Sequence, residues 1–262
     1  MDAPSPFVIT CEHGGNRIPA AYRRYFEERD ALLASHRGYD PGALVMAKAL
    51  ARALAAPLVA STTSRLLVDL NRSIGHPRLH SDATRGADAD VRARIVDRHY
   101  RPYRDKVDRA IERAIARHGR AIHVSSHSFT PVLDGVVRQA DVGLLYDPCR
   151  EGERELCARW KASLAGLAPR LRVRLNYPYA GKGDGVTRMM RKRYAPRTYV
   201  GVELEVNQGV VATGSPAWPA LRAVLIESLR DATRSPLFAD RRSRTPPAHA
   251  SRARRAPAGG HD

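Results

Sequence analysis

The chain has 262 residues, of which 43% are hydrophobic, and this is enough for one sizeable core. No run approaches 18 apolar residues, the N-terminus lacks the charged-then-apolar layout of a signal peptide, and the three cysteines show no Cys-x-x-Cys spacing. These features argue against a membrane protein, a disulfide-framed secreted domain and a cysteine-based zinc site. We expect a soluble, cytoplasmic protein.

The formal charge of +17 is typical of nucleic-acid-binding proteins, but part of it is local. Residues 241–262 contain six arginines and one aspartate, and therefore hold five of the seventeen charges. This segment is rich in Arg, Ala, Pro, Ser and Gly and lacks apolar periodicity, so we expect a domain over 1–238 and a disordered basic tail over 239–262. The remaining charge is not interleaved with aromatic residues, and an anionic small substrate explains it equally well.

The first predicted element is a buried strand that ends at a histidine. Residues 7–19 open as a short apolar, partly β-branched run and then reach Glu12-His13 followed by two glycines, which let the backbone turn sharply. Ligands of open α/β sheets bind at the carboxyl ends of strands. His13 is therefore a candidate site residue, and the alternative is an ordinary loop histidine.

Two helices and a second strand are predicted next. The pattern favours helices over 20–34 and 43–56, the second ended by Pro57, and a strand over 58–63. Asp40 precedes a proline near the start of the second helix, where the ordinary role of an aspartate is to cap the helix.

Residues 64–72, Ser-Arg-Leu-Leu-Val-Asp-Leu-Asn-Arg, are predicted to form an apolar strand between two arginines. Buried arginines need partners. A bound carboxylate is one such partner for Arg65 and Arg72, because the planar guanidinium binds it through two hydrogen bonds. The alternative is an ion pair between Arg72 and Asp69 that only closes a loop.

The pattern then predicts a polar loop, a long helix entered or broken at Pro102, and a third strand, over residues 73–90, 91–118 and 121–131. The loop is long enough to be a lid or a substrate loop. Because side chains alternate along a strand, His123, Ser125 and His127 share one face. His127 lies at the exit of its strand, as His13 does.

The remaining predicted elements are strands over 141–146, 171–175 and 199–208 and helices over 151–167 and 216–233. The glycine-rich loop 176–185 lacks the layout of a phosphate-binding loop. Glu203 and Glu205 share one face of the last strand. This strand is otherwise apolar enough for a central position in the sheet, where acidic residues are unusual and indicate a function. Strands alternate with helices throughout, which predicts an α/β fold: a single-domain, three-layer α/β/α arrangement with a mostly parallel mixed sheet.

Polar residues thus gather at the ends of several strands. Two histidines and a carboxylate are the usual ligands of a catalytic zinc that keeps one position open for water. Such a metal lowers the pKa of its water to about 7 and polarises a carbonyl group. A further carboxylate can act as general base, and arginines can bind an acidic substrate. The combination predicts a hydrolytic metal centre.

At these residues the chain resembles the N-formylglutamate amidohydrolase family. The resemblance is carried by residues 12–19, 64–72, 100–103, 126–131 and 141–143 and by the Glu-bearing last strand. Asp-Leu-Asn-Arg at 69–72 and His-Ser-Phe-Thr-Pro at 127–131 are the most specific segments, and the match spans roughly residues 7–210. It implies the phosphorylase/hydrolase-like fold of zinc carboxypeptidases and aspartoacylases, and an enzyme that removes an N-acyl group such as formyl from an acidic amino acid.

The resemblance also implies residue roles: His13 and His127 as zinc ligands, and Arg65, Asn71, Arg72 and Arg138 as substrate contacts. Zinc carboxypeptidases carry a glutamate ligand three residues after the first histidine, where this chain has Asn16. Asp40 is expected in its place, with Glu12 as the alternative. The implied catalytic base is Glu205 or Glu203. Because both side chains lie on the same face of the strand, the alternation does not decide between them. One Zn²⁺ per chain is expected, although another divalent ion is an alternative.

Three hypotheses for function follow. The first is a zinc-dependent amidohydrolase acting on N-formylglutamate, a small anionic substrate, with a place in histidine degradation. The second keeps the metal but changes the substrate, as in a carboxypeptidase-like enzyme or another N-acyl amino acid deacylase. The third is a basic nucleic-acid-binding protein, whose affinity would fall steeply with salt.

Overall fold

The computed structural model describes residues 5–211, 217–235 and 238, and the predicted tail over 239–262 lies outside the described residues. Its centre is a six-stranded sheet in the order β2-β1-β3-β8-β6-β7. The strands are β1 (Phe7–Cys11), β2 (Leu58–Ala60), β3 (Ala121–Phe129), β6 (Val142–Leu145), β7 (Val173–Leu175) and β8 (Tyr199–Asn207). β2, β1, β3 and β8 run parallel, and β6 is antiparallel to β8. The predicted mostly parallel mixed sheet is confirmed.

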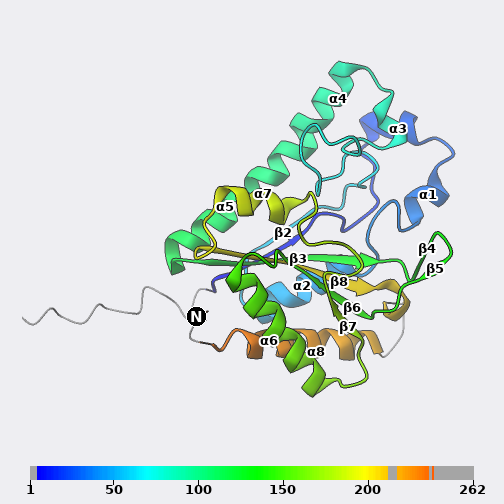
Figure 1. Cartoon of the computed structure of the whole chain (residues 1–262). Helices are drawn as coiled ribbons and strands as arrows, with labels where there is room; N and C mark the ends of the chain where they lie inside the picture. Colours follow the sequence, from blue (N-terminus) through cyan, green and yellow to red (C-terminus); the bar gives the residue numbers. More distant parts are fainter. Residues whose placement is uncertain (1–4, 212–216, 236–237, 239–262) are drawn as a thin grey trace, which may run out of the picture.

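Helices cover both faces of the sheet (Figure 1). One face packs against α2 (Ala43–Ala53), α6 (Glu151–Leu167) and α8 (Ala217–Ala232). The other face packs against α5 (Arg101–His118) and α7 (Val186–Arg193), and α4 (Ala89–Ile95) belongs to the hydrophobic cluster on that side. Because both faces are covered, β1 and β3 are buried at every position, as expected for central parallel strands. The predicted three-layer architecture is therefore confirmed.

The long helix predicted over 91–118 runs without a break through Pro102. A π-helical turn, η2 (Val96–Tyr100), joins α4 to α5 directly before this proline. Proline removes one backbone hydrogen bond from a helix, and here it occupies the first turn of α5, where it is tolerated. Tyr100 is the last residue of the irregular turn and Tyr103 follows it in α5, and both point into the molecule, with 2% and 6% of their surface exposed.

Two predicted elements are wrong. Residues 64–72 form a series of turns, with Leu67 N–H bonded to the Ser64 carbonyl, and their apolar side chains are buried under the helices on that face rather than in the sheet. The helix predicted over 20–34 is a 3₁₀ helix, η1 (Ala20–Phe26), and a short α1 (Asp30–Ala34). Glu28, with φ +58°, interrupts them, because a left-handed residue ends a right-handed helix.

Several short elements were not predicted. They are α3 (Asp82–Arg85) inside the predicted polar loop, the hairpin β4 (Val132–Leu133) and β5 (Val136–Val137), η3 (Gln208–Val210), and α7. Among the described residues, no helix is long and apolar enough to cross a membrane. The three cysteines are free: Cys11 and Cys157 are buried, and Cys149 is exposed.

Candidate metal centre and active site

The polar residues predicted at the strand exits meet at one edge of the sheet. His127 lies opposite Glu205 in the pairing of β3 with β8, and Ser125 lies opposite both Glu203 and, on the other side, Thr10 of β1. Glu12 and His13 follow β1 directly, so they reach the same edge. The carboxyl ends of parallel strands form the ligand-binding edge of open α/β sheets.

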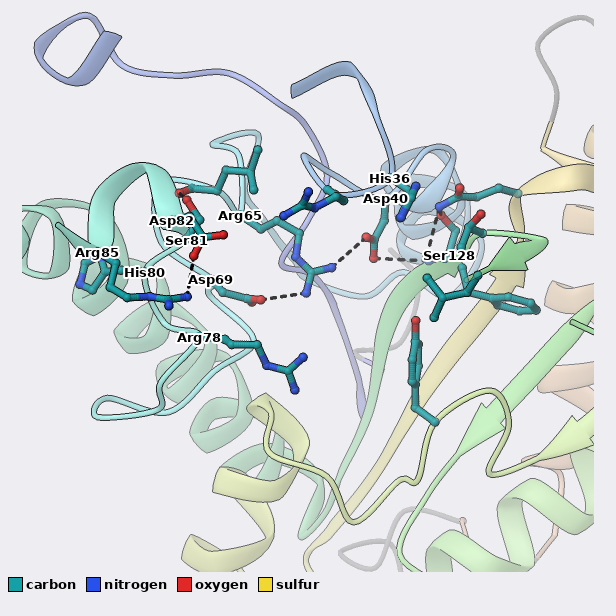
Figure 2. Close-up of a pocket in the computed structure, with 17 residues that line it drawn as sticks. His36, Asp40, Arg65, Asp69, Arg78, His80, Ser81, Asp82, Arg85 and Ser128 are labelled. Carbon is teal, nitrogen blue, oxygen red and sulfur yellow. Dashed lines mark hydrogen bonds and ion pairs between the residues drawn. The ribbon is translucent and has the colours of Figure 1, made fainter. Parts of the chain in front are cut away.

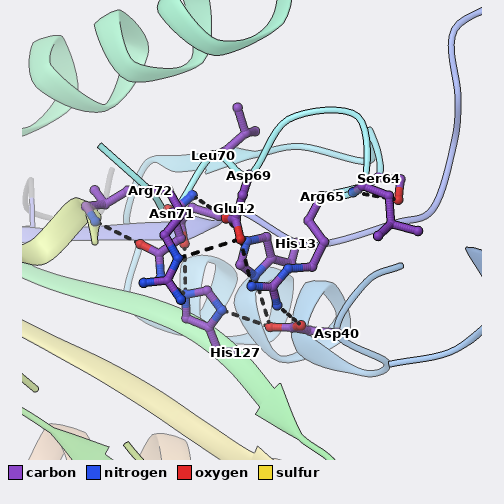
Figure 3. A network of polar contacts seen from close by, with 12 residues as sticks. Glu12, His13, Asp40, Ser64, Arg65, Asp69, Leu70, Asn71, Arg72 and His127 are labelled. Atoms are coloured by element: carbon purple, nitrogen blue, oxygen red, sulfur yellow. Dashed lines mark hydrogen bonds and ion pairs between the residues drawn. The ribbon is translucent and has the colours of Figure 1, made fainter. Parts of the chain in front are cut away.

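His13, Asp40 and His127 form a compact buried cluster (Figure 3). Asp40 Oδ2 lies 2.8 Å from His127 Nδ1 and 3.4 Å from His13 Nδ1. One ligand atom from each of the three residues lies within 4.8 Å of the others, which makes the cluster a possible metal site. The backbone N–H of Asp40 donates to the His13 carbonyl, and α2 has no side-chain cap, so Asp40 does not serve as the helix cap.

The other ring nitrogen of each histidine contacts a further carboxylate, a different one for each ring. Asp69 Oδ1 lies 2.7 Å from His13 Nε2, and Glu12 Oε2 lies 3.1 Å from His127 Nε2. Outer carboxylates of this kind set the tautomer and orientation of metal-ligating histidines. Glu12 is thus placed behind His127, whereas Asp40 faces both Nδ1 atoms.

Glu12 is fully buried and accepts hydrogen bonds from Ser125, at 2.6 Å, and from Tyr103, at 2.7 Å. Burial alone would raise the pKa of Glu12, but the hydrogen bond and charge of His127, together with the two hydroxyl groups, hold it well below its usual range. Burial likewise opposes the charge on His127, but its bonds to Asp40 and Glu12 raise its pKa well above the ordinary value.

Arg65 lines the site but is already paired with two carboxylates. It donates to Asp69 Oδ2 at 2.8 Å and to Asp40 Oδ1 at 3.4 Å. Burial would raise the pKa of Asp69, yet the charges of Arg65 and His13 hold it well below its usual range. Arg65 thus contacts Asp40 and Asp69 at once, and 27% of its side chain is exposed.

The two glutamates of β8 differ in their partners. Glu203 accepts a hydrogen bond from Thr187 of α7 at 2.5 Å. Glu205 is buried, and its Oε2 has no hydrogen-bond partner among the described residues. Burial raises the pKa of Glu205 to about 8. Thus one glutamate is held by a neighbouring helix, and the other presents an unpaired oxygen beside His127.

A cavity of about 620 Å³ opens over the cluster. Its lining includes His13, Asp40, Arg65, Asn71, Arg72, His127, Glu203 and Glu205. Asn71 Oδ1 accepts from the Val186 amide at 2.8 Å, and Arg72 donates to the Asp184 carbonyl at 3.1 Å, so both side chains are oriented.

Arg138 does not belong to the lining of this cavity. Its guanidinium lies over the rings of Phe129 and Tyr179, at 5.7 and 5.0 Å from their centres. Tyr179 does line the cavity, so Arg138 contacts one of the lining side chains without lining the cavity itself.

Two residues of the site were not identified from the sequence. Asp69 was considered only as a partner of Arg72, whose Nε lies 4.0 Å away, while its shorter contact is with His13. Tyr103 was quoted within a Tyr-x-Pro-Tyr segment, but nothing local indicates that it reaches Glu12, 91 positions away. The Asp-x-Asn-Arg motif was the only signal for Asp69.

Comparison with known proteins gives both a family and structural neighbours. A sequence model described as N-formylglutamate amidohydrolase matches residues 5–212. The structure is similar to that of the gene product Atu2144 from Agrobacterium tumefaciens, with a TM-score of 0.76, 29% identity, and coverage of 87% of this chain and 90% of that chain. It is also similar to N-formylglutamate amidohydrolase from Ralstonia eutropha JMP134, with a TM-score of 0.65, 19% identity, and coverage of 88% and 94%. No curated protein gave a significant match.

Proposed function

Because this chain belongs to the N-formylglutamate amidohydrolase family, and is therefore a hydrolase of amide bonds, we propose that it releases the acyl group of N-formylglutamate, or of a closely related N-acyl acidic amino acid, in a metal-dependent reaction. The observation that carries this proposal is the buried His13–Asp40–His127 cluster at the base of a 620 Å³ cavity.

The residues of the cluster fit a zinc ion. Two imidazole nitrogens and one carboxylate oxygen are a common ligand set of catalytic zinc, and three protein ligands leave a position for water. The second nitrogen of each histidine is already fixed by a carboxylate. The surroundings are also rich in buried carboxyl groups, which favours a bound cation; these groups are Glu12, Asp40, Asp69 and Glu205. A bound zinc would supply an activated water and polarise the amide carbonyl.

The protein's own residues have distinct roles in this proposal. A cation held by the cluster would offset the burial that raises the pKa of Glu205, so its unpaired Oε2 would be ionised, take the proton of the attacking water and later deliver it to the leaving amine. Asn71 is oriented by the first residue of α7 and Arg72 by the loop before it, and both bind the α-carboxylate of the substrate. Arg65 keeps Asp40 and Asp69 ionised and in place.

Metal content of the purified protein tests the metal-dependent part. Wild type is measured beside His13→Ala and His127→Ala, with His99→Ala as the control for a histidine that lies outside the cluster and does not line the cavity. We expect about one zinc per chain in the wild type and the control, and loss of zinc and of N-formylglutamate hydrolysis in the other two. Full activity in either cluster variant, or activity of the wild type that neither chelators nor added zinc change, would rule out the metal-dependent reaction.

A second candidate substrate class is favoured by the size of the cavity. A volume of 620 Å³ lies in the range that accommodates drug-sized ligands, so an acyl group larger than formyl also fits. A panel of N-acylated glutamates, from formyl to longer chains, separates the two: the chain length with the highest kcat/KM identifies the substrate class. A role in histidine degradation, a cytoplasmic location and any binding of nucleic acid through the basic tail stay predictions.

A further inference from the structure

A cavity of about 760 Å³ lies between α5 and α7, two helices on the same side of the sheet (Figure 1). It shares no lining residue with the 620 Å³ cavity over the metal cluster, or with the cavity beside Asp40 and Arg65 that Figure 2 shows. Its lining combines apolar side chains with charged ones, among them Ile74, Met189, Arg104 and Asp108. A cavity of this size and mixture accommodates a small organic molecule and offers it both apolar and ionic contacts.

Arg104 of this lining is a buried arginine that has no carboxylate partner among the described residues, with 5% of its surface exposed. Its Nη1 donates to the Leu70 carbonyl at 2.9 Å, its Nη2 contacts the Met189 sulfur, and its Nε has no hydrogen-bond partner in the described part of the chain. A thioether is a weak acceptor. The guanidinium edge formed by Nε and Nη2 therefore lacks a good acceptor, although such an edge binds a carboxylate through two parallel hydrogen bonds. Because a buried charge is costly without a partner, this edge points to an anionic ligand.

The guanidinium of Arg104 is held in position for such a ligand. Besides its bond to Leu70, it lies over the ring of Tyr100, 5.4 Å from the ring centre, and the Tyr100 hydroxyl is itself bonded to the Arg72 carbonyl at 2.7 Å. Met189, in contrast, is only partly buried, and its unbranched side chain is flexible. A ligand carboxylate would therefore meet an oriented binding edge and displace one adaptable side chain.

Asp108, one turn further along α5, offers the opposite charge. Its Oδ2 accepts from Arg193 at 2.9 Å, whereas its Oδ1 is buried and has no hydrogen-bond partner among the described residues. Residues four apart on a helix lie on the same face, yet no ion pair joins Asp108 to Arg104 within the described chain. The cavity thus combines an unpaired donor edge and an unpaired acceptor atom with the apolar side chains of Met189 and Ile74, of which Ile74 is 54% exposed. The other charged side chains of the lining are exposed to solvent: Arg101, Asp105, Lys192 and Arg193.

We infer that this cavity binds a small zwitterion, an α-amino acid with an apolar side chain. The carboxylate of the ligand binds the Nε–Nη2 edge of Arg104, its ammonium group donates to Asp108 Oδ1, and its side chain packs on Ile74 and Met189. The substrate proposed for the metal cluster does not match this site, because acylation removes the charge from its nitrogen. The inference therefore goes beyond the proposed function and does not depend on the hydrolysis of any substrate.

Calorimetry with L-leucine tests the site, together with two analogues that each lack one charge. Leucinamide lacks the carboxylate, and leucic acid has a hydroxyl group in place of the ammonium group. We expect one leucine per wild-type chain, and binding of each analogue about 10- to 100-fold weaker. Arg104→Gln and Asp108→Asn should weaken leucine binding by about the same factor, and Ile74→Ser by about 3- to 10-fold. Arg109→Gln, at an exposed arginine of the same helix outside the cavity, should leave it unchanged.

Arg72→Ala separates this site from the active site, because leucine also carries an α-carboxylate. Leucine binding that persists in Arg72→Ala and is weakened in Asp108→Asn supports the inferred site. Arg104→Gln also loses the bond to Leu70, so circular dichroism checks its fold, and Asp108→Asn and the exposed Ile74→Ser decide if it does not fold.

Four results would overturn the site: no binding of leucine to the wild type, equal binding of either analogue, unchanged affinity in Asp108→Asn and Ile74→Ser, or loss of binding in Arg72→Ala alone. Hydrolysis of N-formylglutamate, measured separately, bears only on the proposed function.

Discussion

His123 gives the fold a predictable sensitivity to acid. It lies in the middle of β3 with none of its surface exposed, and its ring nitrogens contact the Thr10 hydroxyl at 2.8 Å and the Tyr199 hydroxyl at 2.7 Å. Burial lowers the pKa of His123 from about 6.5 to about 4. The native protein therefore keeps this imidazole neutral in a range where the unfolded chain binds a proton.

The sign and size of the effect follow from linkage. Between pH 6.5 and pH 4 the unfolded state holds more protons at this position, so the free energy of unfolding falls as the pH falls. The difference between the two pKa values, at about 1.4 kcal/mol for each pH unit, amounts to about 3 kcal/mol by pH 4. Above pH 6.5 the residue contributes no pH dependence.

The change His123→Gln removes this titration. We expect the variant to be less stable than the wild type at pH 7, because it repacks a buried site, but the gap should shrink by about 3 kcal/mol between pH 7 and pH 4. Urea unfolding followed by circular dichroism across this range measures it. Wild-type and His123→Gln curves that run parallel would refute the assignment of a neutral, buried imidazole.

Three further predictions concern the site and its frame. Asp69→Asn should weaken zinc binding about 10- to 100-fold in chelator competition, because a neutral amide holds His13 Nε2 less firmly; unchanged affinity would contradict the outer-carboxylate role. Glu205→Gln should lower kcat about 10²- to 10⁴-fold and Glu203→Gln much less, and the reverse order in steady-state assays would move the base to Glu203. Gly143→Ala should lower the free energy of unfolding by about 1–3 kcal/mol in urea, since a Cβ there would overlap a backbone oxygen; an unchanged midpoint would show that the loop yields.

The frame of the site was predictable because its signals are local. His13 directly follows an apolar strand, and period-two alternation along the strands of His127 and Glu205 tells which side chains share a face without knowledge of the fold. The partners that complete the site come from far along the chain. Asp40 is 27 positions from His13, and Asp69 is 56 positions from it, so their contacts depend on tertiary packing.

The errors have physical causes as well. The segment 64–72 reads as a strand because a short apolar run is equally compatible with buried turns, and periodicity cannot distinguish the two. Helix α7, Val186–Arg193, has only eight residues, and four of them are arginine or lysine. Too few apolar residues are left to predict a helix from their spacing. Its omission had a consequence: Thr187 of this helix is the group that binds Glu203, so without α7 the two glutamates of β8 looked equivalent.

The π-helical turn η2 sets how α5 is rotated about the helix axis relative to α4. In a helix with 3.6 residues per turn, one residue more or less rotates everything beyond it by roughly 100°. Tyr100 donates to the Arg72 carbonyl at 2.7 Å, and Tyr103 donates to Glu12. Deleting one residue of η2 would therefore rotate α5 by about 100° relative to α4 and turn Tyr103 away from Glu12, so the length of this one turn sets the alignment of α5 with the His13–Asp40–His127 cluster.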